Sequence, residues 1–334
     1  MKFSKMITAI DTHTCGEPTR IVTGGIGPIP GSTVSEKMLY FRENMDSLRT
    51  MLMHEPRGHS VMSGAILTEP RHSDADIGVI YLETGGYLPM CGHDTIGVCT
   101  ALVETGMVNV SEPVTSITLE TPAGLVRATV KVKDGSAESV TFKNTESFLY
   151  KKGLCVHIDG IGNVVTDIAY GGNFYAIVDA EDVGIKISPE YSAEIKRIGS
   201  EIKKRVNQEI EVIHPEKPFI RQVTHVCFSE RMHAPRLSRK NAVVITNGDI
   251  DRSPCGTGTC AVLSKMYSEK EITKGDVFLS ESIIGTRFFA SVVEESLIGG
   301  IPGVLCEVEG RAFITGFHTF VVDPQDSLRD GFML

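Results

Sequence analysis

Two glycine-flanked cysteine turns, one in each half of the chain, constrain its fold more than any other feature. Cys91-Gly92-His93-Asp94-Thr95 follows the apolar run Ile77–Leu82, and Cys255-Gly256-Thr257-Gly258-Thr259 follows the shorter run Ala242–Ile245. Both turns read Cys-Gly-x-x-Thr, and each opens a stretch with the apolar spacing of a helix. The two cysteines lie about one domain length apart. The repeat therefore predicts two related halves, each with a cysteine where a strand passes into a helix.

A cysteine at such a turn lies in an unusual chemical environment. The free N–H groups of a helix's first turn attract a carboxylate or another anion, and they lower the pKa of a thiol. Gly92 and Gly256 let the backbone bend sharply and approach a ligand closely. No Gly-Lys-Ser/Thr follows these glycines, which disfavours a P-loop. The sequence also has no Cys-x-x-Cys pair, which disfavours a zinc site. We therefore take Cys91 and Cys255 as candidate catalytic residues and expect no metal.

Composition narrows the class of protein. The 334 residues are 41% hydrophobic and 22% charged, which is typical of a globular protein long enough for two domains. A net charge of −9 gives no basic surface for nucleic acid or an anionic membrane. No signal peptide or membrane-spanning run is visible, so we expect a cytoplasmic protein whose partner is a small-molecule substrate. In that compartment, eight cysteines do not predict a disulfide framework.

The order of strand and helix patterns predicts the fold class. Helices are expected at 36–53, 96–104, 189–210 and 260–267, and strands at 6–10, 19–23, 61–67, 77–82, 116–121, 125–132, 139–142, 164–170, 174–178, 224–228, 242–246, 312–314 and 319–322. The alternation is not strictly βαβ, and hairpin signals such as Asp134-Gly135 favour antiparallel pairing. We predict an α/β (α+β) protein of two similar domains, 1–130 and 136–305. Each is a curved, mostly antiparallel sheet packed around a helix, with the active site in the cleft between the domains.

Two thiols at one cleft admit three chemistries. A redox pair needs sulfur–sulfur contact, usually from a Cys-x-x-Cys motif, and a single nucleophile leaves the second turn without a role. A base and an acid on opposite faces of one carbon use both turns and invert a stereocentre. The helix N-termini suit an α-carboxylate, and nothing resembles a pyridoxal phosphate site, so no cofactor is expected. His93 and Asp251 are candidates to hold the substrate's ammonium, although a helix-start hydrogen bond and an Asx turn are equally compatible with them.

The motifs resemble those of the proline racemase family. Met90-Cys91-Gly92-His93 and Asp251–Thr259 are similar to its two signatures, and the likeness runs from Ala9–His13 to Ile314–His318. The resemblance implies a cofactor-independent homodimer with the two-domain fold of diaminopimelate epimerase, in which the C-terminal strands, 308–334, complete the first domain. It also implies that the two cysteines transfer protons. The implied substrate contacts are Gly92, His93, Gly256 and Thr257 for the carboxylate, and Asp251 with His93 for the ring nitrogen.

The resemblance also bears on the substrate. Dehydratases of the family have threonine in place of the second cysteine, so Cys255 favours a racemase or an epimerase. Proline racemases place phenylalanines against the bare ring at positions that match Ser63 and Ile245 here. Ser63 and nearby His225 would receive a ring hydroxyl, which favours 4-hydroxyproline 2-epimerase over proline racemase. Trans-3-hydroxy-L-proline dehydratase, a thiol redox protein and an amino-acid binding protein remain as alternatives.

One residue departs from the family pattern beside the first cysteine. Asp94 stands where glycine is common. A carboxylate here would either raise the pKa of Cys91 or simply favour the helix N-terminus.

Overall fold

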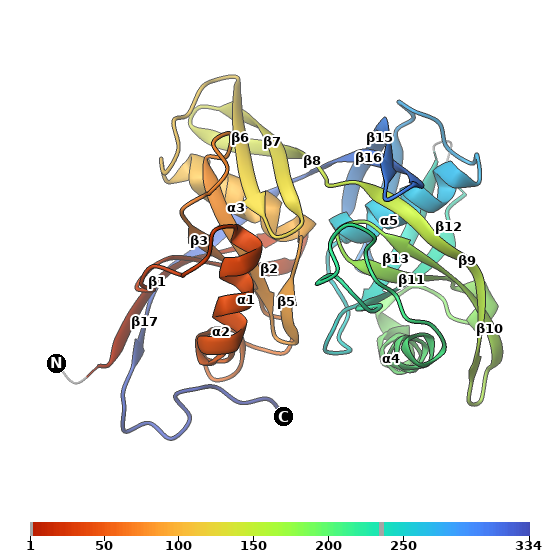
Figure 1. Ribbon diagram of the computed structural model, residues 1–334, viewed down its shortest axis with the longest axis horizontal. Helices are drawn as coiled ribbons and strands as arrows, with labels where there is room; N and C mark the ends of the chain where they lie inside the picture. Colours follow the sequence, from red (N-terminus) through yellow and green to blue (C-terminus); the bar gives the residue numbers. More distant parts are fainter. Residues whose placement is uncertain (1–2, 234–236) are drawn as a thin grey trace. The chain divides into compact units, whose positions relative to one another are not determined.

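The computed structural model describes residues 3–233 and 237–334 and divides into two compact units. The first unit comprises the chain up to Phe142 together with Gly310–Leu334, and the second comprises Lys143–Glu309 (Figure 1). Within the described residues, no helix combines the length and the hydropathy needed to cross a membrane.

The first unit is a mixed sheet that packs on a buried helix. Its helices are α1 (Val34–Asn44), α2 (Asp46–Met53) and α3 (Gly92–Glu104), and its strands are β1 (Lys5–Thr14), β2 (Glu17–Gly24), β3 (Ser63–Thr68), β4 (Ile77–Glu83), β5 (Gly86–Leu88), β6 (Val114–Thr121), β7 (Gly124–Lys133), β8 (Ser136–Lys143) and β17 (Ala312–Val322). Hydrogen-bonded neighbours run β17-β1-β2-β3-β4-β6-β7, with β2–β3 and β4–β6 parallel and the other pairs antiparallel. Helix α3 packs against β1, β2, β3, β7 and β17.

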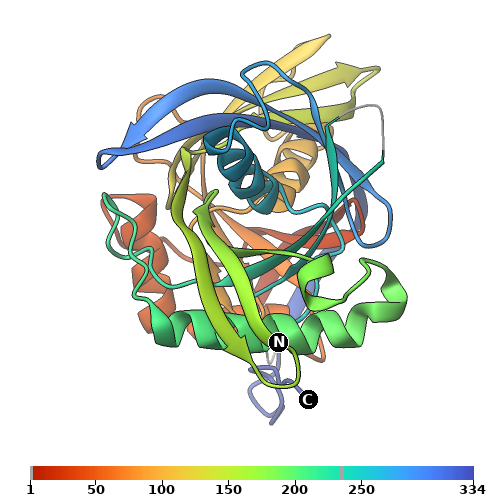
Figure 2. The same ribbon diagram turned by 90° about the vertical axis from the view of Figure 1, so that its right-hand side faces the viewer.

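The second unit closes its strands into a ring. Its strands are β9 (Ser147–Ile158), β10 (Gly162–Tyr170), β11 (Phe174–Asp179), β12 (His225–Arg231), β13 (Ser238–Val244), β14 (Phe278–Glu281), β15 (Arg287–Ile298) and β16 (Ile301–Gly310). Each strand pairs with the next, and β16 pairs back to β9, so the sheet formed by these eight described strands has no edge strand. Helix α5 (Gly256–Ser268) packs against β9, β10, β11 and β15. Helix α4 (Ser192–Glu209) packs on β9, β11, β12 and β13, and in Figure 2 the yellow-green β9–β10 hairpin crosses it.

Close backbone packing lets the two central helices sit inside their sheets. Both helices are buried along most of their length, as expected for helices with apolar or small residues on every face. A Cβ added at Gly97 of α3 would lie 2.6 Å from Thr12 Oγ1. A Cβ added at Gly171, in the β10–β11 turn, would lie 2.1 Å from the carbonyl oxygen of Thr257. A larger residue at Gly97 would push α3 away from β1, and one at Gly171 would push α5 away from the β10–β11 turn. Either change would displace the cysteine at the start of that helix.

The structure departs from the sequence prediction in several elements. The helix expected over 36–53 is two helices, because the backbone at Met45 leaves helical geometry (φ −134°, ψ 15°) while the apolar pattern continues across it. Strand β1 continues to Thr14, beyond the expected end at residue 10, and turns at Cys15-Gly16. Strands β9 and β14–β16 were not predicted, because charged residues interrupt their alternation, as at Lys151-Lys152.

Candidate active site

The first cysteine turn is held rigidly by its own backbone. Cys91 is the N-cap of α3 in an ordinary extended conformation, with φ −138° and ψ 123°. Its carbonyl oxygen accepts hydrogen bonds from the Thr95 N–H at 3.1 Å and from the Thr95 hydroxyl at 2.7 Å. The Tyr81 hydroxyl, from β4, lies 2.6 Å from that same threonine oxygen. Strand and helix are thus joined under the cysteine, which leaves its side chain fixed in place.

A chain of three side chains begins at the Cys91 sulfur. The Sγ atom lies 3.3 Å from Nδ1 of His93, and Nε2 of the same ring lies 3.1 Å from Oδ1 of Asp94. The backbone of His93 is tied to β1 by the Thr14 hydroxyl, which donates to its carbonyl oxygen at 2.8 Å. All three side chains of this Cys91–His93–Asp94 chain are buried. Both ring nitrogens of the histidine are therefore engaged.

The Asp94 carboxylate is in turn anchored from two strands. Its Oδ1 accepts a hydrogen bond from the Thr19 hydroxyl of β2 at 2.7 Å, and its Oδ2 accepts one from the Ser63 hydroxyl of β3 at 2.8 Å. The carboxylate has no solvent exposure. Ser63, singled out from the sequence as a substrate contact, is thus linked to the cysteine turn through Asp94.

Burial and the neighbouring charges set the protonation of this chain. Burial, with the Asp94 carboxylate second, raises the pKa of Cys91 to about 12, although His93 opposes the rise. Burial lowers the pKa of His93, but Asp94 and Cys91 outweigh it and raise that pKa well above its ordinary value. Burial thus favours the protonated thiol of Cys91, while the Asp94 carboxylate favours protonation of His93 by raising its pKa.

These three residues also offer donor atoms that lie within 4.8 Å of one another, close enough for a metal ion. However, both oxygens of Asp94 already accept hydroxyl hydrogen bonds, and His93 bridges the cysteine and the aspartate. Hydrogen bonding therefore accounts for all three side chains without an ion.

The second cysteine turn is strained where the first is relaxed. Cys255 is the N-cap of α5 with φ +61° and ψ 101°, a left-handed region that costs a residue with a Cβ roughly 1 kcal/mol or more. Two hydrogen bonds hold this conformation: the Ser253 N–H donates to Asp251 Oδ1 at 2.7 Å, and the Cys255 N–H donates to the Ser253 hydroxyl at 3.0 Å. Asp251 is buried and forms an Asx turn, the structural role that the sequence left open for it.

Neutral donors surround the Cys255 sulfur. The Tyr175 hydroxyl, from β11, lies 3.3 Å from Sγ and 2.6 Å from Thr257 Oγ1. A Cβ at Gly258 would lie 3.0 Å from the sulfur, so only glycine lets this backbone approach it. Burial, with the Asp251 carboxylate second, raises the pKa of Cys255 well above its usual value, and hydrogen bonds from Tyr175 and from the Gly258 N–H lower it in part.

The remaining candidates lie around this second turn. The ring of His225 packs on Tyr175 with centroids 5.0 Å apart, and its Nδ1 lies 2.7 Å from the Thr224 hydroxyl. Burial, with Lys203 second, lowers the pKa of His225 to about 3, so the ring is neutral. Ile245 is buried just after β13, where its N–H donates to the Asp249 carbonyl oxygen, two residues before Asp251.

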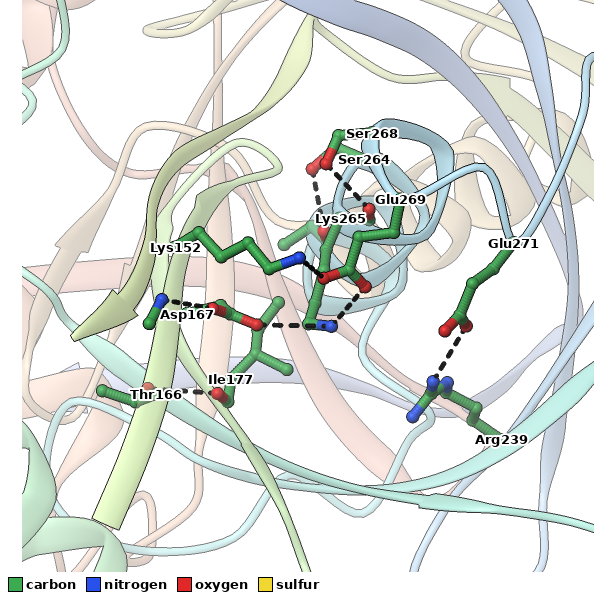
Figure 3. Close-up of polar contacts among 12 residues, drawn as sticks. Lys152, Thr166, Asp167, Ile177, Arg239, Ser264, Lys265, Ser268, Glu269 and Glu271 are labelled. Atoms are coloured by element: carbon green, nitrogen blue, oxygen red, sulfur yellow. Dashed lines mark hydrogen bonds and ion pairs between the residues drawn. The ribbon is translucent and has the colours of Figure 1, made fainter. Parts of the chain in front are cut away.

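Ion pairs fix the far end of the helix that carries Cys255. Lys265 of α5 contacts Asp167 of β10 at 3.2 Å and Glu269 at 2.6 Å, and Lys152 of β9 reaches Glu269 at 2.7 Å (Figure 3). Helix α5 is thereby attached at its C-terminal end to two strands of the ring.

Each unit therefore gathers one set of the expected residues. In the first unit Cys91, Gly92, His93 and Ser63 come together. In the second, Cys255, Gly256, Thr257 and Asp251 form one turn, His225 packs on Tyr175 beside it, and Ile245 bonds to the backbone of Asp249, shortly before the turn. The sequence had not singled out Tyr175 or Thr19. Tyr175 stands in an apolar strand pattern that gives no sign of its hydroxyl's partner. The pairing of β2 with β3 is what brings Thr19 level with Ser63.

The chain was compared with known proteins, and the model of the proline racemase family matches residues 9–333. The chain belongs to this family. A 4-hydroxyproline 2-epimerase from Streptosporangium roseum is 48% identical over 100% of both chains, and a proline racemase from Clostridioides difficile is 45% identical over 100% of both. A solved hydroxyproline epimerase from Agrobacterium vitis, with bound trans-4-hydroxy-L-proline, superposes with a TM-score of 0.95 at 34% identity, covering 100% of this chain and 97% of that one.

Membership of the proline racemase family bears on two of the sequence predictions. The similarity to the Agrobacterium vitis structure confirms the mixed α/β fold class with few helices. The relatives from Streptosporangium roseum and Clostridioides difficile are isomerases, which confirms the predicted enzyme class at the level of the family.

Proposed function

We propose that this chain is a cofactor-independent epimerase that inverts Cα of 4-hydroxyproline, with Cys91 and Cys255 as paired base and acid. The observation that most supports this proposal is the matched pair of buried thiols, each at the N-terminus of a helix enclosed by strands. Neither thiol has a second cysteine within its own motif, which disfavours a redox pair.

In the proposed reaction both cysteines act on Cα of the same substrate. One cysteine, as thiolate, takes the Cα proton, so that the Cα–H bond breaks and an S–H bond forms. The other cysteine, as thiol, gives its proton to the opposite face, so that its S–H bond breaks and a new Cα–H bond forms. The next turnover, in the reverse direction, restores both groups. Burial makes each thiolate a stronger base than it is in water, which suits a weakly acidic Cα–H.

The helix N-termini supply the electrostatic stabilisation. The free N–H groups at Gly92-His93 and Gly256-Thr257 are proposed to bind the substrate carboxylate, where they oppose the negative charge that develops as the Cα–H bond breaks. Asp251 is proposed to contact the ring nitrogen, because its carboxylate is buried beside Cys255 and would attract the substrate's positive charge. The same carboxylate fixes the strained turn, so it would serve both purposes.

The preference for a hydroxylated ring rests on Ser63. The Ser63 hydroxyl donates its hydrogen to Asp94 at 2.8 Å, which leaves the oxygen lone pairs to accept a hydrogen bond from a substrate hydroxyl. His225 is neutral with Nδ1 engaged, so Nε2 is its proposed contact for the same group. Ile245 would provide the apolar wall beside it. Binding of unsubstituted proline would leave these buried polar atoms without a substrate partner, which costs binding free energy.

Proton NMR in D2O tests the proposal. Reduced protein is incubated with trans-4-hydroxy-L-proline in one tube and L-proline in another. We expect loss of the α-proton signal and appearance of the C2 epimer with hydroxyproline, and at least roughly tenfold slower exchange with proline. Exchange that is faster with proline would make the chain a proline racemase and would contradict the role given to Ser63.

A lack of exchange in both tubes would contradict the two-thiol proposal itself. The assay would then be repeated with trans-3-hydroxy-L-proline to look for dehydration. Unchanged ligand that nonetheless binds, measured by titration calorimetry, would identify a binding protein instead.

A further inference from the structure

We propose that Asp94 is a positioning residue that holds the His93 ring, as an imidazolium, against the Cys91 sulfur. This inference rests on the proposed function, because it gives the ring a task in proton transfer by Cys91. It assigns the ring of His93 to the cysteine, whereas the resemblance to the family implies contact with the substrate nitrogen.

The contacts around the ring carry the proposal. Nδ1 of His93 lies 3.3 Å from the Cys91 sulfur and Nε2 lies 3.1 Å from Asp94 Oδ1, so the two ring nitrogens face the cysteine and the aspartate in turn. An imidazolium donates from both nitrogens, and both neighbours are acceptors. With both directions occupied inside a buried site, the ring cannot turn to another partner without losing a charge-assisted hydrogen bond.

Asp94 is itself held so that it cannot follow the ring. The hydroxyls of Thr19 and Ser63 donate to its two oxygens from neighbouring strands, β2 and β3. Each oxygen is therefore fixed by the sheet, and Oδ1 serves the histidine and Thr19 together. Such a shell of hydrogen bonds is what fixes a reacting group in place.

The consequence for Cys91 is a cation that is already present when the thiolate forms. The thiol gives up its proton in one direction of the reaction and leaves a buried negative charge. An imidazolium N–H at 3.3 Å opposes that charge without any rearrangement. Because Asp94 keeps the ring charged while the sulfur is still neutral, the histidine does not have to take a proton from the cysteine first.

The titratable groups that act most strongly on this ring are its two hydrogen-bond partners. Cys91 and Asp94 are the two whose charges influence His93 most. Tyr81 of β4 lies beyond Thr95, and burial raises its pKa well above its ordinary value, so it is neutral over the working range. The hydroxyls of Thr14, Thr19 and Ser63, on β1, β2 and β3, also bond to this chain, to the His93 carbonyl oxygen and to the two oxygens of Asp94.

The decisive experiment measures the ring directly and needs no turnover. Wild-type protein labelled with ¹⁵N-histidine is titrated between pH 5.5 and 9, and a His93→Gln spectrum identifies the His93 signals. We expect both ring nitrogens to stay protonated above pH 8 in the wild type, and one of them to lose its proton near neutral pH in Asp94→Asn. A neutral His93 at pH 7 in the wild type would overturn the proposal, even if the variant failed to fold.

Kinetics then separate positioning from a merely structural role. Relative to wild type, kcat of Asp94→Asn should fall roughly 10- to 100-fold at pH 8.5 and recover towards wild type near pH 6. The direction follows because the ring loses its charge only where the pH exceeds its lowered pKa. A ratio of variant to wild-type kcat that is constant with pH would reject the proposal.

A matched control removes a different carboxylate from the same unit. Glu120→Gln weakens the hydrogen bonds that Glu120 accepts from the N–H groups of Arg71 and His72 and leaves the turn intact. Its His93 titration should match that of the wild type. If neither proline nor hydroxyproline exchanged in D2O, the proposed function would fail while the ¹⁵N titration would still decide how Asp94 acts on His93.

Discussion

The two cysteine turns share a motif and differ in almost everything around the sulfur. Cys91 has a relaxed backbone and faces a charged chain, His93 followed by Asp94. Cys255 has a left-handed backbone and faces a neutral hydroxyl and a backbone N–H, from Tyr175 and Gly258. Part of the difference lies in the two variable positions of Cys-Gly-x-x-Thr, which are His-Asp in the first turn and Thr-Gly in the second, and part lies outside the motif, in Tyr175 and in the hydrogen bonds of Ser253.

This comparison shows how one motif can support two thiols of different electrostatic character. The cysteine, glycine and threonine that recur in the two motifs give both helices the same start. In each turn the final threonine N–H donates to the cysteine carbonyl oxygen. The variable pair then places an imidazole and a carboxylate beside the first sulfur, whereas the second sulfur has the Gly258 N–H together with the hydroxyl of Tyr175. A charge-assisted hydrogen bond is roughly twice as strong as a neutral one, so the first turn is the better place for a thiolate.

The largest expected effect comes from removing either sulfur. Cys91→Ser and Cys255→Ser should each lower kcat for inversion at least about 10³-fold, because a serine hydroxyl is a far weaker acid than a thiol and cannot complete the proton transfer. Inversion and α-proton exchange are followed by NMR in D2O, and thermal unfolding checks that each variant is folded. If one variant retained inversion while the other lost it, only one cysteine would be required and the paired mechanism would be wrong.

A smaller effect distinguishes the histidines of the two units by their pH dependence. Burial lowers the pKa of His225 to about 3. Between pH 6.5 and 3, this histidine is therefore protonated in the unfolded chain but neutral in the folded chain. The stability that this neutral ring contributes is present above pH 6.5 and is lost as pH falls through that window. From pH 7 to 4, the free energy of unfolding should fall by on the order of a few kcal/mol more in wild type than in His225→Gln.

Urea unfolding at pH 7, 5 and 4 measures both slopes. His214, whose pKa burial lowers to about 4, remains in both proteins and contributes equally to each slope. Equal slopes in the two proteins would mean that His225 is not held neutral in the folded state. The charged His93 and the neutral His225 would then cease to mark a difference between the turns.

The smallest effect concerns the anchoring of α5. Glu269→Gln removes the carboxylate that Lys152 and Lys265 share, and we expect a loss of less than about 1 kcal/mol in the free energy of unfolding, which shrinks in 1 M NaCl. Activity should change by less than about twofold, because the pairs lie at the end of the helix opposite Cys255. Urea unfolding at low and high salt measures the first effect.

Glu294→Gln provides the matched comparison for this anchoring. It removes the exposed partner of Lys143 of β8, at 2.7 Å, which lies on a strand rather than on α5. A larger loss of activity in Glu269→Gln than in Glu294→Gln would show that the ion pairs position the Cys255 turn. Dependence on ion pairs at the far end of the helix would then be a further feature of the second turn.

Local patterns predicted the turns, whereas partners from distant strands could not be predicted. The apolar runs and glycines around Cys91 and Cys255 placed both cysteines at helix starts, as the structure does. The contact between Ser63 and Asp94 depends on how β3 lies against α3, which no spacing along the chain reveals. For the same reason Tyr175 was read as one residue of an apolar strand, although its hydroxyl lies beside the Cys255 sulfur. The break at Met45 was missed because it has no glycine or proline to announce it.

The closed ring of strands in the second unit has a consequence for synthesis of the protein. The ring is completed only when Val304 of β16, near the end of the unit, pairs with Ser147 of β9, near its beginning. When the ribosome has synthesised α5 but not yet β16, the sheet around this apolar helix is incomplete. Because such distant pairings form slowly, this half should mature late and should depend most on protection from aggregation while its last strands emerge.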